Sequence, residues 1–420
     1  MKLFFSTFAA SVLFTMMTED SYVLCQVNGS DSFQPIDYSK VQPNSMMKAA
    51  SVSPLISEQL MPQSNSVPQQ PKSMRRLQTS SPQSLMTSSS GCTLSGTYKK
   101  GTDISSCSTI NINSLDVPAG VTLDLSLAKK GATIIFNGNT TFGTRKWEGP
   151  LVRVSGINLM VKGSGILNGL GAWYWKQGQS ITRPVFFKLQ NAINSTVTGF
   201  TIMDMPFRTF SIVTCKNTIL KGLTIDSRSG KDLAKNTDGF GLTKNENVVI
   251  VNNTIFNQDD CLAMQSSTNT TFRNNYCCDS HGISIGSIGA NSVDVSTTVR
   301  GLIVEGNTIE NSVNGLRIKA ISGLQGLVSN IRYINNRVLN VRNAIVIRSD
   351  YSKAKGKYDG PPTSKVIIEN VMISGLSGSA TNLYDIVVNP KVVSNWDFSD
   401  LSVTALFKGK LSGLPLNLQL

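Results

Sequence analysis

The sequence predicts an all-β fold built as a solenoid, and three observations support this prediction. Charged residues make up only 15% of the 420 residues, aromatic residues 7%, and glycine occurs 34 times, which is typical of short strands joined by turns. Short runs of alternating apolar residues recur after Gly91, separated by Asn, Gly or Asp. Finally, Val251-Asn252-Asn253 recurs as Arg273-Asn274-Asn275, and 273 − 251 gives a period of 22. A repeat of this length indicates stacked coils with a continuous core.

Strands are expected where apolar and polar residues alternate. These stretches are 133–136, 151–154, 159–161, 196–202, 210–213, 218–225, 248–255, 302–309, 315–318, 331–338, 344–347 and 366–373. Asparagines recur near the turns, at Asn252, Asn274, Asn307 and Asn335, and predict a ladder of stacked amides along the axis. A β-sandwich would also contain many short strands, but the recurrence at a fixed period favours the solenoid.

The first 90 residues differ from the rest of the chain. Residues 1–25 combine Lys2, an apolar stretch and the polar Thr18-Glu19-Asp20, which is typical of a secretory signal peptide and too short for a membrane span. Residues 26–90 are rich in Ser, Gln and Pro, and such a segment buries too little apolar surface to fold. We therefore expect a disordered pro-segment or linker over 26–90 and one secreted, extracellular solenoid domain over 91–420, with no membrane span.

The chain is basic: 39 Lys and Arg stand against 26 Asp and Glu, a net charge of +13. Residues 1–90 hold six basic and five acidic residues, so +12 belongs to residues 91–420. Such an excess suits an anionic partner, whether nucleic acid, a membrane surface or an acidic polysaccharide. No Lys/Arg-rich helix or aromatic-basic motif is present, so we expect no nucleic-acid binding. On charge alone, a merely soluble basic protein is an equally good interpretation.

Cysteine usage fits an oxidising compartment. The seven cysteines are Cys25, Cys92, Cys107, Cys215, Cys261, Cys277 and Cys278. A Cys92–Cys107 bridge would close a loop over the first coil, and a Cys261–Cys277 bridge would brace the wall that carries the acids described next. A loop of about 15 residues contributes roughly 3 kcal/mol in the entropic model. Cys278 could compete for Cys261. Adjacent cysteines with a single histidine do not form a zinc ligand set, and we expect no metal or other cofactor.

An acidic cluster lies within the repeat. Asp238 and Asp260 are one full period apart in the sequence, and so are Asp259 and His281. Residues one period apart lie on adjacent coils, about 4.8 Å apart, so three carboxylates should meet the only histidine of the chain. Packed carboxylates repel one another, and one should keep a proton near neutral pH. Glycosidic cleavage needs this division between an acid and a base, although an isolated acidic pair is more often a solvated turn.

Three further residues complete the candidate site. A lone histidine is more often structural than catalytic, but His281 stacks on Asp259 and precedes Gly282, so we expect it to hydrogen-bond the acid and tune its pKa. Arg317 and Lys319 occupy alternate positions of a strand and point to the same side. Many strands carry such a basic face in solvent. Beside an acid cluster, the two cations would instead bind a substrate carboxylate.

Four motifs in this order resemble the polygalacturonase (pectinase) family of glycoside hydrolases. They are Asn236-Thr237-Asp238, Gln258-Asp259-Asp260, Ser280-His281-Gly282 and Arg317-Ile318-Lys319. The resemblance extends from about Gly91 to the end of the chain. It implies a single-stranded right-handed parallel β-helix with an open groove. It also implies metal-independent hydrolysis of α-1,4-galacturonan, with inversion at the anomeric carbon.

The resemblance also implies a role for each residue. Asp259 would be the general acid, Asp238 and Asp260 would position and deprotonate the water, and His281 would support the acid. The residues expected to contact substrate are Asn236, Arg317, Lys319 and Tyr351. Ser280 departs from the family, which usually has glycine before the histidine. A side chain there is expected to strain the turn or to narrow the groove.

The resulting hypothesis is a secreted, monomeric endo-polygalacturonase that acts on homogalacturonan in pectin. Its expected partner is this anionic polysaccharide, and a proteinaceous inhibitor is a second candidate partner. Exo-action is the nearest alternative and depends on insertions that close one end of the groove, none of which stands out. A pectate lyase would need calcium-binding acids and an arginine base. A catalytically inactive binding protein is disfavoured because all three acids are present.

Overall fold

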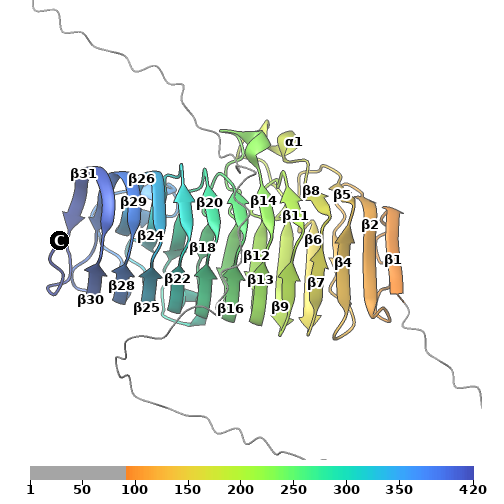
Figure 1. The fold of residues 1–420 in the computed structure, drawn as a ribbon, viewed down its shortest axis with the longest axis horizontal. Helices are drawn as coiled ribbons and strands as arrows, with labels where there is room; N and C mark the ends of the chain where they lie inside the picture. The colour runs from red at the N-terminus through yellow and green to blue at the C-terminus, as the bar shows by residue number, and fades with distance from the viewer. Residues whose placement is uncertain (1–90) are drawn as a thin grey trace, which may run out of the picture. The chain divides into compact units, whose positions relative to one another are not determined.

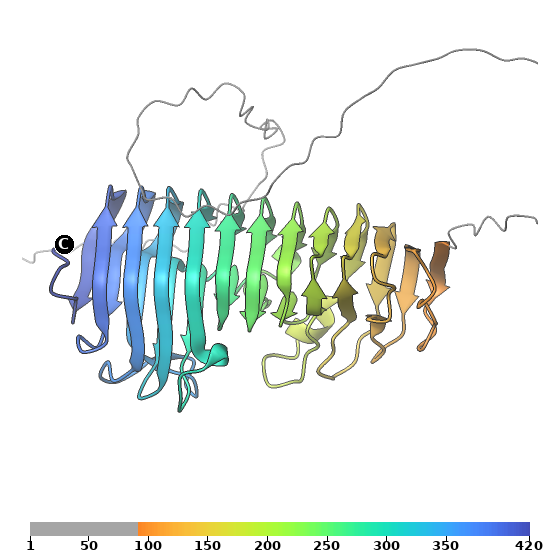
Figure 2. The same ribbon diagram turned by 90° about the horizontal axis from the view of Figure 1, so that it is seen from below.

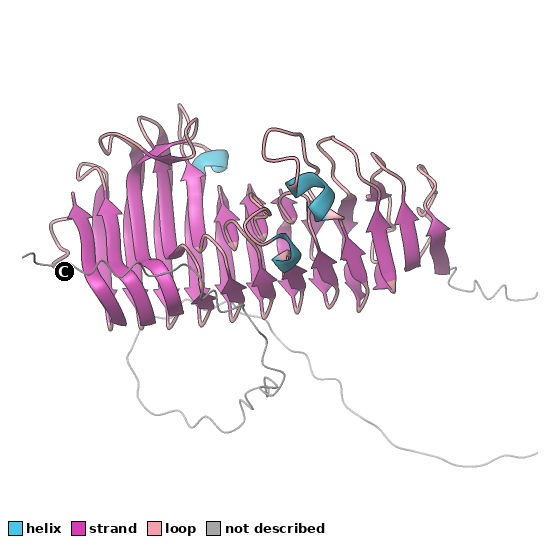
Figure 3. Ribbon diagram, turned by 90° about the horizontal axis from the view of Figure 1, so that it is seen from above, coloured by secondary structure: helices cyan, strands magenta, loops and turns pink. Residues whose placement is uncertain are grey.

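The computed structural model describes residues 91–420, and the signal peptide and pro-segment predicted for residues 1–90 lie outside them. The described residues form a stack of coils, seen from three sides in Figures 1, 2 and 3. Neighbouring strands pair in parallel except where β26 (Arg337–Ser352) meets β27 (Lys357–Tyr358). The predicted all-β solenoid is therefore confirmed as a parallel β-helix. Within 91–420, no helix is long and apolar enough to cross a membrane.

Three columns of parallel strands run along the stack. The first contains β1 (Gly91–Thr97), β2 (Thr109–Val117), β4 (Thr133–Asn137), β7 (Met160–Gly163), β10 (Thr196–Thr198), β13 (Lys216–Lys221), β16 (Asn245–Val251), β19 (Ser267–Arg273), β22 (Thr298–Glu305), β25 (Gln325–Ile334), β28 (Lys365–Ser374) and β30 (Val393–Ser399). The second contains β5 (Asn139–Phe142), β8 (Ile166–Asn168), β11 (Thr201–Met203), β14 (Thr224–Asp226), β17 (Thr254–Phe256), β20 (Tyr276–Cys278) and β23 (Thr308–Glu310).

The third column forms the floor of the candidate site. It contains β3 (Leu123–Leu125), β6 (Val152–Ile157), β9 (Phe187–Ile193), β12 (Phe210–Val213), β15 (Phe240–Thr243), β18 (Leu262–Met264), β21 (Ile283–Ile288) and β24 (Asn314–Ile321). In the last coils β26, β29 (Ser377–Val387) and β31 (Ser402–Ser412) bend through both the second and third columns. The helices are short: α1 (Gly171–Trp175) and the 3-10 turns η2 (Arg228–Gly230) and η3 (Val295–Thr297).

Five of the expected strands each prove to be two strands that meet at a corner. The stretch 248–255, for example, consists of β16 and β17, and Asn252 lies between them with a φ of 56°. Gly222 and Gly306 turn the chain in the same way in other coils, with φ values of 59° and 63°. This left-handed region is open to glycine and tolerated by asparagine. The apolar alternation continues through the corner, so the pattern does not reveal it.

The amide ladder exists, but three of its four predicted members are wrong. The buried ladder consists of Asn253, Asn275, Asn307 and Asn336. Each Nδ2 donates to the Oδ1 of the next member, at 2.9, 3.1 and 2.9 Å in order along the chain. Asn252, Asn274 and Asn335 instead occupy exposed corners with positive φ. The ladder residue is the one after the corner in these three coils, because its side chain turns inward there.

The floor of the site rests on stacked aromatic rings. Phe187, Phe210 and Phe240 lie one above another in the third column, and their ring centroids are 5.1 and 5.2 Å apart. All three side chains are fully buried. Aromatic pairs at this spacing stabilise a core beyond the area that they bury. The strands that carry the candidate site therefore have a densely packed support beneath them.

Both predicted disulfides are present. Cys92 pairs with Cys107 over the first coil, and Cys261 pairs with Cys277 with a Cα–Cα distance of 6.0 Å. Cys278 therefore does not displace Cys277. The free cysteine of residues 91–420 is Cys215, which is buried.

Candidate active site

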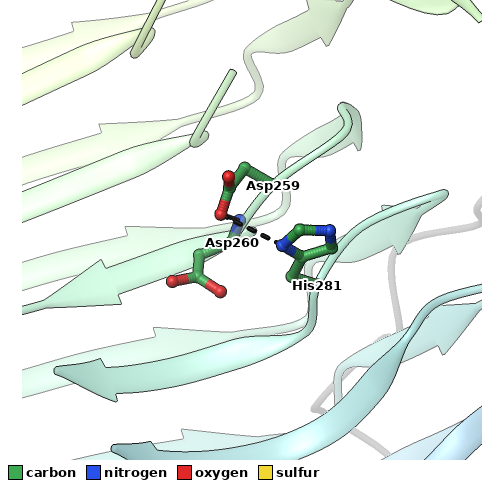
Figure 4. Close-up of side chains that lie close together, drawn as sticks. All are labelled: Asp259, Asp260 and His281. Atoms are coloured by element: carbon green, nitrogen blue, oxygen red, sulfur yellow. Dashed lines mark hydrogen bonds and ion pairs between the residues drawn. The ribbon is translucent and has the colours of Figure 1, made fainter. Parts of the chain in front are cut away.

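The predicted stacking of the acids is confirmed by the backbone. Asp238 lies just before β15, and Asp259 and Asp260 lie just before β18. The amide of Gly239 donates to the carbonyl of Asp260 at 2.9 Å, and the amide of His281 donates to the carbonyl of Asp259 at 2.8 Å. Figure 4 shows that Asp259 and His281 face each other from neighbouring coils, while the carboxyl group of Asp260 points away from their contact. Three carboxyl groups therefore lie together where the floor strands begin.

Asp259 accepts hydrogen bonds that favour its charged form. Its carboxylate accepts from the Asp260 amide at 2.8 Å and from Nδ2 of Asn236 at 3.2 Å. Nδ1 of His281 lies 3.2 Å from Oδ1 of Asp259, which is the contact predicted from the sequence. Burial raises the pKa of Asp259, but the hydrogen bond and charge of His281, the charge of Lys319 and the Asp260 amide together hold that pKa well below its ordinary value.

Asp260 is buried and fully partnered. Nη2 of Arg317 donates to its Oδ1, and Nζ of Lys319 donates to its Oδ2 at 2.7 Å. The hydroxyl of Ser284 also donates to Oδ1 at 2.9 Å and accepts from Nε of Arg317 at 2.8 Å. All these side chains are nearly inaccessible to solvent. Asp260 is therefore held in one orientation by two cations and one hydroxyl.

Asp238 differs from its two neighbours. No group in residues 91–420 donates a hydrogen bond to its carboxyl. Burial, followed by repulsion from Asp259 and Asp260, raises its pKa to about 7, and the nearby charges of Arg208 and Lys319 lower it by less. The expectation that one carboxyl of the cluster keeps a proton near neutral pH thus agrees with the structure. The raised pKa favours Asp238 as the holder of that proton, whereas the resemblance assigns the acid role to Asp259.

The cluster lies in a groove with further polar residues that the sequence reasoning partly missed. Asn236, Lys319 and Tyr351, all predicted, line this groove together with Arg208, which was not predicted. Nζ of Lys319 lies 5.7 Å from the centroid of the Tyr351 ring. Burial raises the pKa of the Tyr351 hydroxyl. These predicted substrate-contacting residues are therefore brought to one groove.

A buried arginine behind the groove was also missed. Arg183 donates to Oδ1 of Asn236 at 2.8 Å and to the carbonyl of Lys235 at 2.7 Å. Burial lowers its pKa, while the charges of Asp238 and Asp259 act in the opposite direction. Arg183 therefore fixes the Asn236 amide that donates to Asp259. It belongs to no recurring motif, so the sequence offered no signal for it.

Contrary to the expectation from the sequence, Ser280 does not narrow the groove. Its side chain is fully buried, and its hydroxyl lies 3.0 Å from the hydroxyl of Ser312 on the next coil. The Ser280 hydroxyl also accepts from the Gly282 amide at 3.1 Å. Its φ is not positive, whereas Asp279 and Gly282 on either side of the histidine turn have φ values of 58° and 97°. The serine thus ties the turn that carries His281 to the next coil.

The cluster is a poor metal site. Potential ligand atoms of Asp259, Asp260 and His281 lie within 4.8 Å of one another, and carboxylates with imidazole suit several divalent ions. The carboxylate oxygens of Asp260, however, already face the cations of Arg317 and Lys319. A divalent ion would have to displace these side chains or bind beside two positive charges. The donor set therefore fits the pairing that is present better than it fits a metal.

A parallel β-helix whose groove holds clustered carboxyl groups has the acid and base that a glycoside hydrolase requires. Residues 107–412 match the family model for Glycosyl hydrolases family 28, and the chain belongs to this family. The resemblance noted in the motifs is thereby confirmed.

Similar proteins agree in both sequence and structure. A polygalacturonase of Saccharomyces cerevisiae is 39% identical over 334 residues, which cover 77% of this chain and 91% of that protein. Endopolygalacturonase B of Aspergillus niger is 38% identical over 323 residues, or 74% of this chain and 87% of that protein. The solved structure of endopolygalacturonase I from Stereum purpureum, complexed with two galacturonate, superposes with a TM-score of 0.60 at 26% identity. That match covers 75% of this chain and all of the other.

Proposed function

We propose that this protein is an endo-polygalacturonase, which hydrolyses α-1,4 linkages between galacturonosyl units inside homogalacturonan chains. The observation that carries this proposal is the groove in which three carboxyl groups lie beside Arg208 and Lys319. Carboxyl groups supply the acid and base that glycosidic cleavage requires, and cations in the groove suit an acidic sugar chain. The names of the similar fungal proteins support the same substrate.

In the proposed mechanism Asp259 protonates the leaving oxygen, and Asp260 with Asp238 positions and deprotonates the attacking water. Direct attack by water from the opposite face gives inversion. Asp260 suits the water because Arg317, Lys319 and Ser284 fix its direction. His281 suits a supporting role because its Nδ1 meets Oδ1 of Asp259.

The acid must acquire its proton when substrate binds. In the free protein, hydrogen bonds hold the pKa of Asp259 low, and Asp238 keeps the proton of the cluster. A bound sugar chain excludes water and adds its own carboxylates, and both effects raise the pKa of a nearby carboxyl group. Asp259 then takes up a proton, from Asp238 or from solvent, and donates it to the departing sugar. Substrate binding and proton uptake are therefore coupled in this proposal.

The substrate contacts follow from the remaining donors. Lys319 has three N–H groups, of which Asp260 uses one, so the others can reach a sugar carboxylate. The Asn236 amide and the Tyr351 ring line the same groove and suit the ring and hydroxyl groups of a sugar. Secretion, the monomeric state and binding of an inhibitor protein remain predictions from the sequence.

The first test is hydrolysis of polygalacturonate by wild type and Asp259→Asn, with reducing ends and viscosity followed together. We expect wild type to lower the viscosity quickly, as an endo-acting enzyme does, and the variant to lose a factor of about 10² to 10⁴ in kcat. Unchanged circular dichroism and Tm would show that the variant is folded. Slow viscosity loss would indicate exo-action instead.

A second substrate separates the acid from the bases. An aryl galacturonide with a strongly acidic phenol needs no proton on its leaving group. It should restore the rate of Asp259→Asn but not that of Asp260→Asn. Restoration of Asp238→Asn instead would move the acid role to Asp238. Retention of more than about a tenth of the wild-type rate by Asp259→Asn on polygalacturonate would refute the acid assignment, given the size of such effects.

A further inference from the structure

The cations around the groove differ in how far they are already engaged. Arg317 and Lys319 are buried and paired with Asp260, and Arg183 is buried against Asn236. Arg208 is exposed and lines the groove, yet within residues 91–420 its guanidinium has no ion pair or hydrogen bond. Its whole guanidinium is therefore available to an incoming anion, whereas Lys319 already gives one N–H to Asp260.

We propose that Arg208 binds a carboxylate of the sugar chain. This carboxylate would lie beyond the cleavage point, toward the N-terminal coils of the protein. Arg208 would thereby select free uronate over its methyl ester. This inference rests on the proposed function. It concerns a position that none of the four motifs contains, and it adds a specificity-determining residue to the groove.

The position of Arg208 relative to the acids supports this role. It precedes β12, and the amide of the following residue, Thr209, donates to the carbonyl of Asp238 at 2.8 Å. Arg208 is therefore one coil from Asp238 and two coils from Asp260. At about 4.8 Å per coil, its backbone lies about 10 Å along the groove from that of Asp260. Lys319, on β24, lies two coils away in the opposite direction. The Lys319 side chain reaches back to the acids, where its Nζ contacts Asp260 at 2.7 Å. A chain bound across the acids would therefore meet Lys319 at the acids and Arg208 toward the N-terminal coils.

The guanidinium of Arg208 is also oriented. Its Cζ lies 5.0 Å from the centroid of the Phe207 ring, and Cζ of Arg183 lies 4.9 Å from the same ring. A ring that contacts two guanidinium groups attracts both by cation–π interaction. Arg208 therefore loses less side-chain freedom on binding than a fully solvated arginine would. Its planar fork matches a carboxylate with two hydrogen bonds, and a methyl ester cannot offer the same charge.

An exposed arginine is ordinarily only solvated, and three observations separate Arg208 from that case. It lines the same groove as the acids, it lies against an aromatic ring, and its charge reaches Asp238, whose pKa it lowers. The last point agrees with the position of Arg208 in the lining of the groove. Neutralising it would remove attraction for an anion at this location.

The test is calorimetric binding of trigalacturonate and of its methyl ester to full-length protein carrying Asp259→Asn, which prevents turnover. Arg208→Met keeps the length of the side chain and removes its charge, whereas Arg208→Lys keeps the charge without the fork. The matched control is Arg332→Met, an exposed arginine in the first column on β25. Hydrolysis of polygalacturonate by the wild type is measured in parallel.

We expect Arg208→Met to raise the Kd for trigalacturonate by about tenfold to a hundredfold, the scale of a hydrogen bond to a charged group. The Kd for the methyl ester should change by less than about twofold, Arg208→Lys should recover part of the loss, and Arg332→Met should have no effect. Equal loss for both ligands, or an unchanged Kd, would overturn the inference. If the wild type hydrolyses polygalacturonate but the Kd for trigalacturonate does not depend on Arg208, this inference alone would be refuted. Arg208-dependent binding without hydrolysis would refute only the proposed function.

Discussion

Replacing Asp238 by Asn should change how the stability of the protein depends on pH. Burial and the charges of Asp259 and Asp260 raise the pKa of this carboxyl from 3.8 to about 7. Between these values the folded protein keeps a proton that the unfolded chain releases. Stability therefore falls as pH rises, by about 1.4 kcal/mol per pH unit. Over the whole window the free energy of unfolding falls by about 4 kcal/mol. Asp238→Asn has no carboxyl to titrate at this position and should not show this fall.

The opposite shift of Asp259 does not obscure this window. Its pKa is held below the ordinary value of 3.8, so its stabilising contribution is fully present above that pH and is lost only in stronger acid. Between pH 4 and pH 7, the difference between wild type and Asp238→Asn therefore isolates one carboxyl. Asp116→Asn, which changes an exposed acid on β2, serves as the control for removing one charge.

The assay is equilibrium unfolding in guanidinium chloride at intervals from pH 4 to pH 7.5. We expect the free energy of unfolding of Asp238→Asn to gain on that of the wild type as pH rises, while Asp116→Asn stays parallel to the wild type. Parallel curves for Asp238→Asn would show that the carboxyl is ionised throughout. The conclusion that Asp238 holds the proton of the cluster would then be wrong, and so would proton transfer from it to Asp259.

Two further predictions concern the walls of the site. Arg317→Ala leaves buried Asp260 with one cation fewer, so the free energy of unfolding should fall by about 3–5 kcal/mol in chemical unfolding. A fall no larger than that caused by exposed Arg332→Ala would contradict a structural ion pair. Cys261→Ala opens a bridge between residues 16 positions apart, and the free energy of unfolding should fall by about 3 kcal/mol. Unchanged stability of that variant would show that the bridge does not constrain the unfolded chain.

The stacking of the acids was predictable because these parallel coils repeat without a shift in register. Phe240 pairs with Leu262 in the third column, and the interval between these two residues equals the interval from Asp238 to Asp260. Residues that are one period apart in the sequence are therefore neighbours on adjacent coils. The location of the proton was not predictable in this way. It depends on which carboxylate accepts hydrogen bonds, and these come from Asn236 and the histidine turn.

Arg208 escaped prediction because its coil is out of period. Phe210 pairs with Phe240, a longer interval in the sequence than the one from Phe240 to Leu262, since the segment with η2 lengthens the intervening coil. No repeated text aligns Arg208 with the acids. The amide ladder failed for a related reason. Asn252 and Asn253 are adjacent asparagines, and only the corner geometry decides which of them turns inward.

The three cations of the site have different roles, because they differ in what they already contact. The sequence assigned both Arg317 and Lys319 to a substrate carboxylate, yet both are bound to Asp260. If Arg317 released Asp260 to bind a sugar, the carboxylate would lose the contact that fixes its direction just when it must meet the water. Lys319 retains N–H groups for a second partner, and the guanidinium of Arg208 faces the groove without an acidic partner among the described residues. The geometry therefore favours Arg317 as a positioning residue, Lys319 as a contact to both groups, and Arg208 as a binding residue.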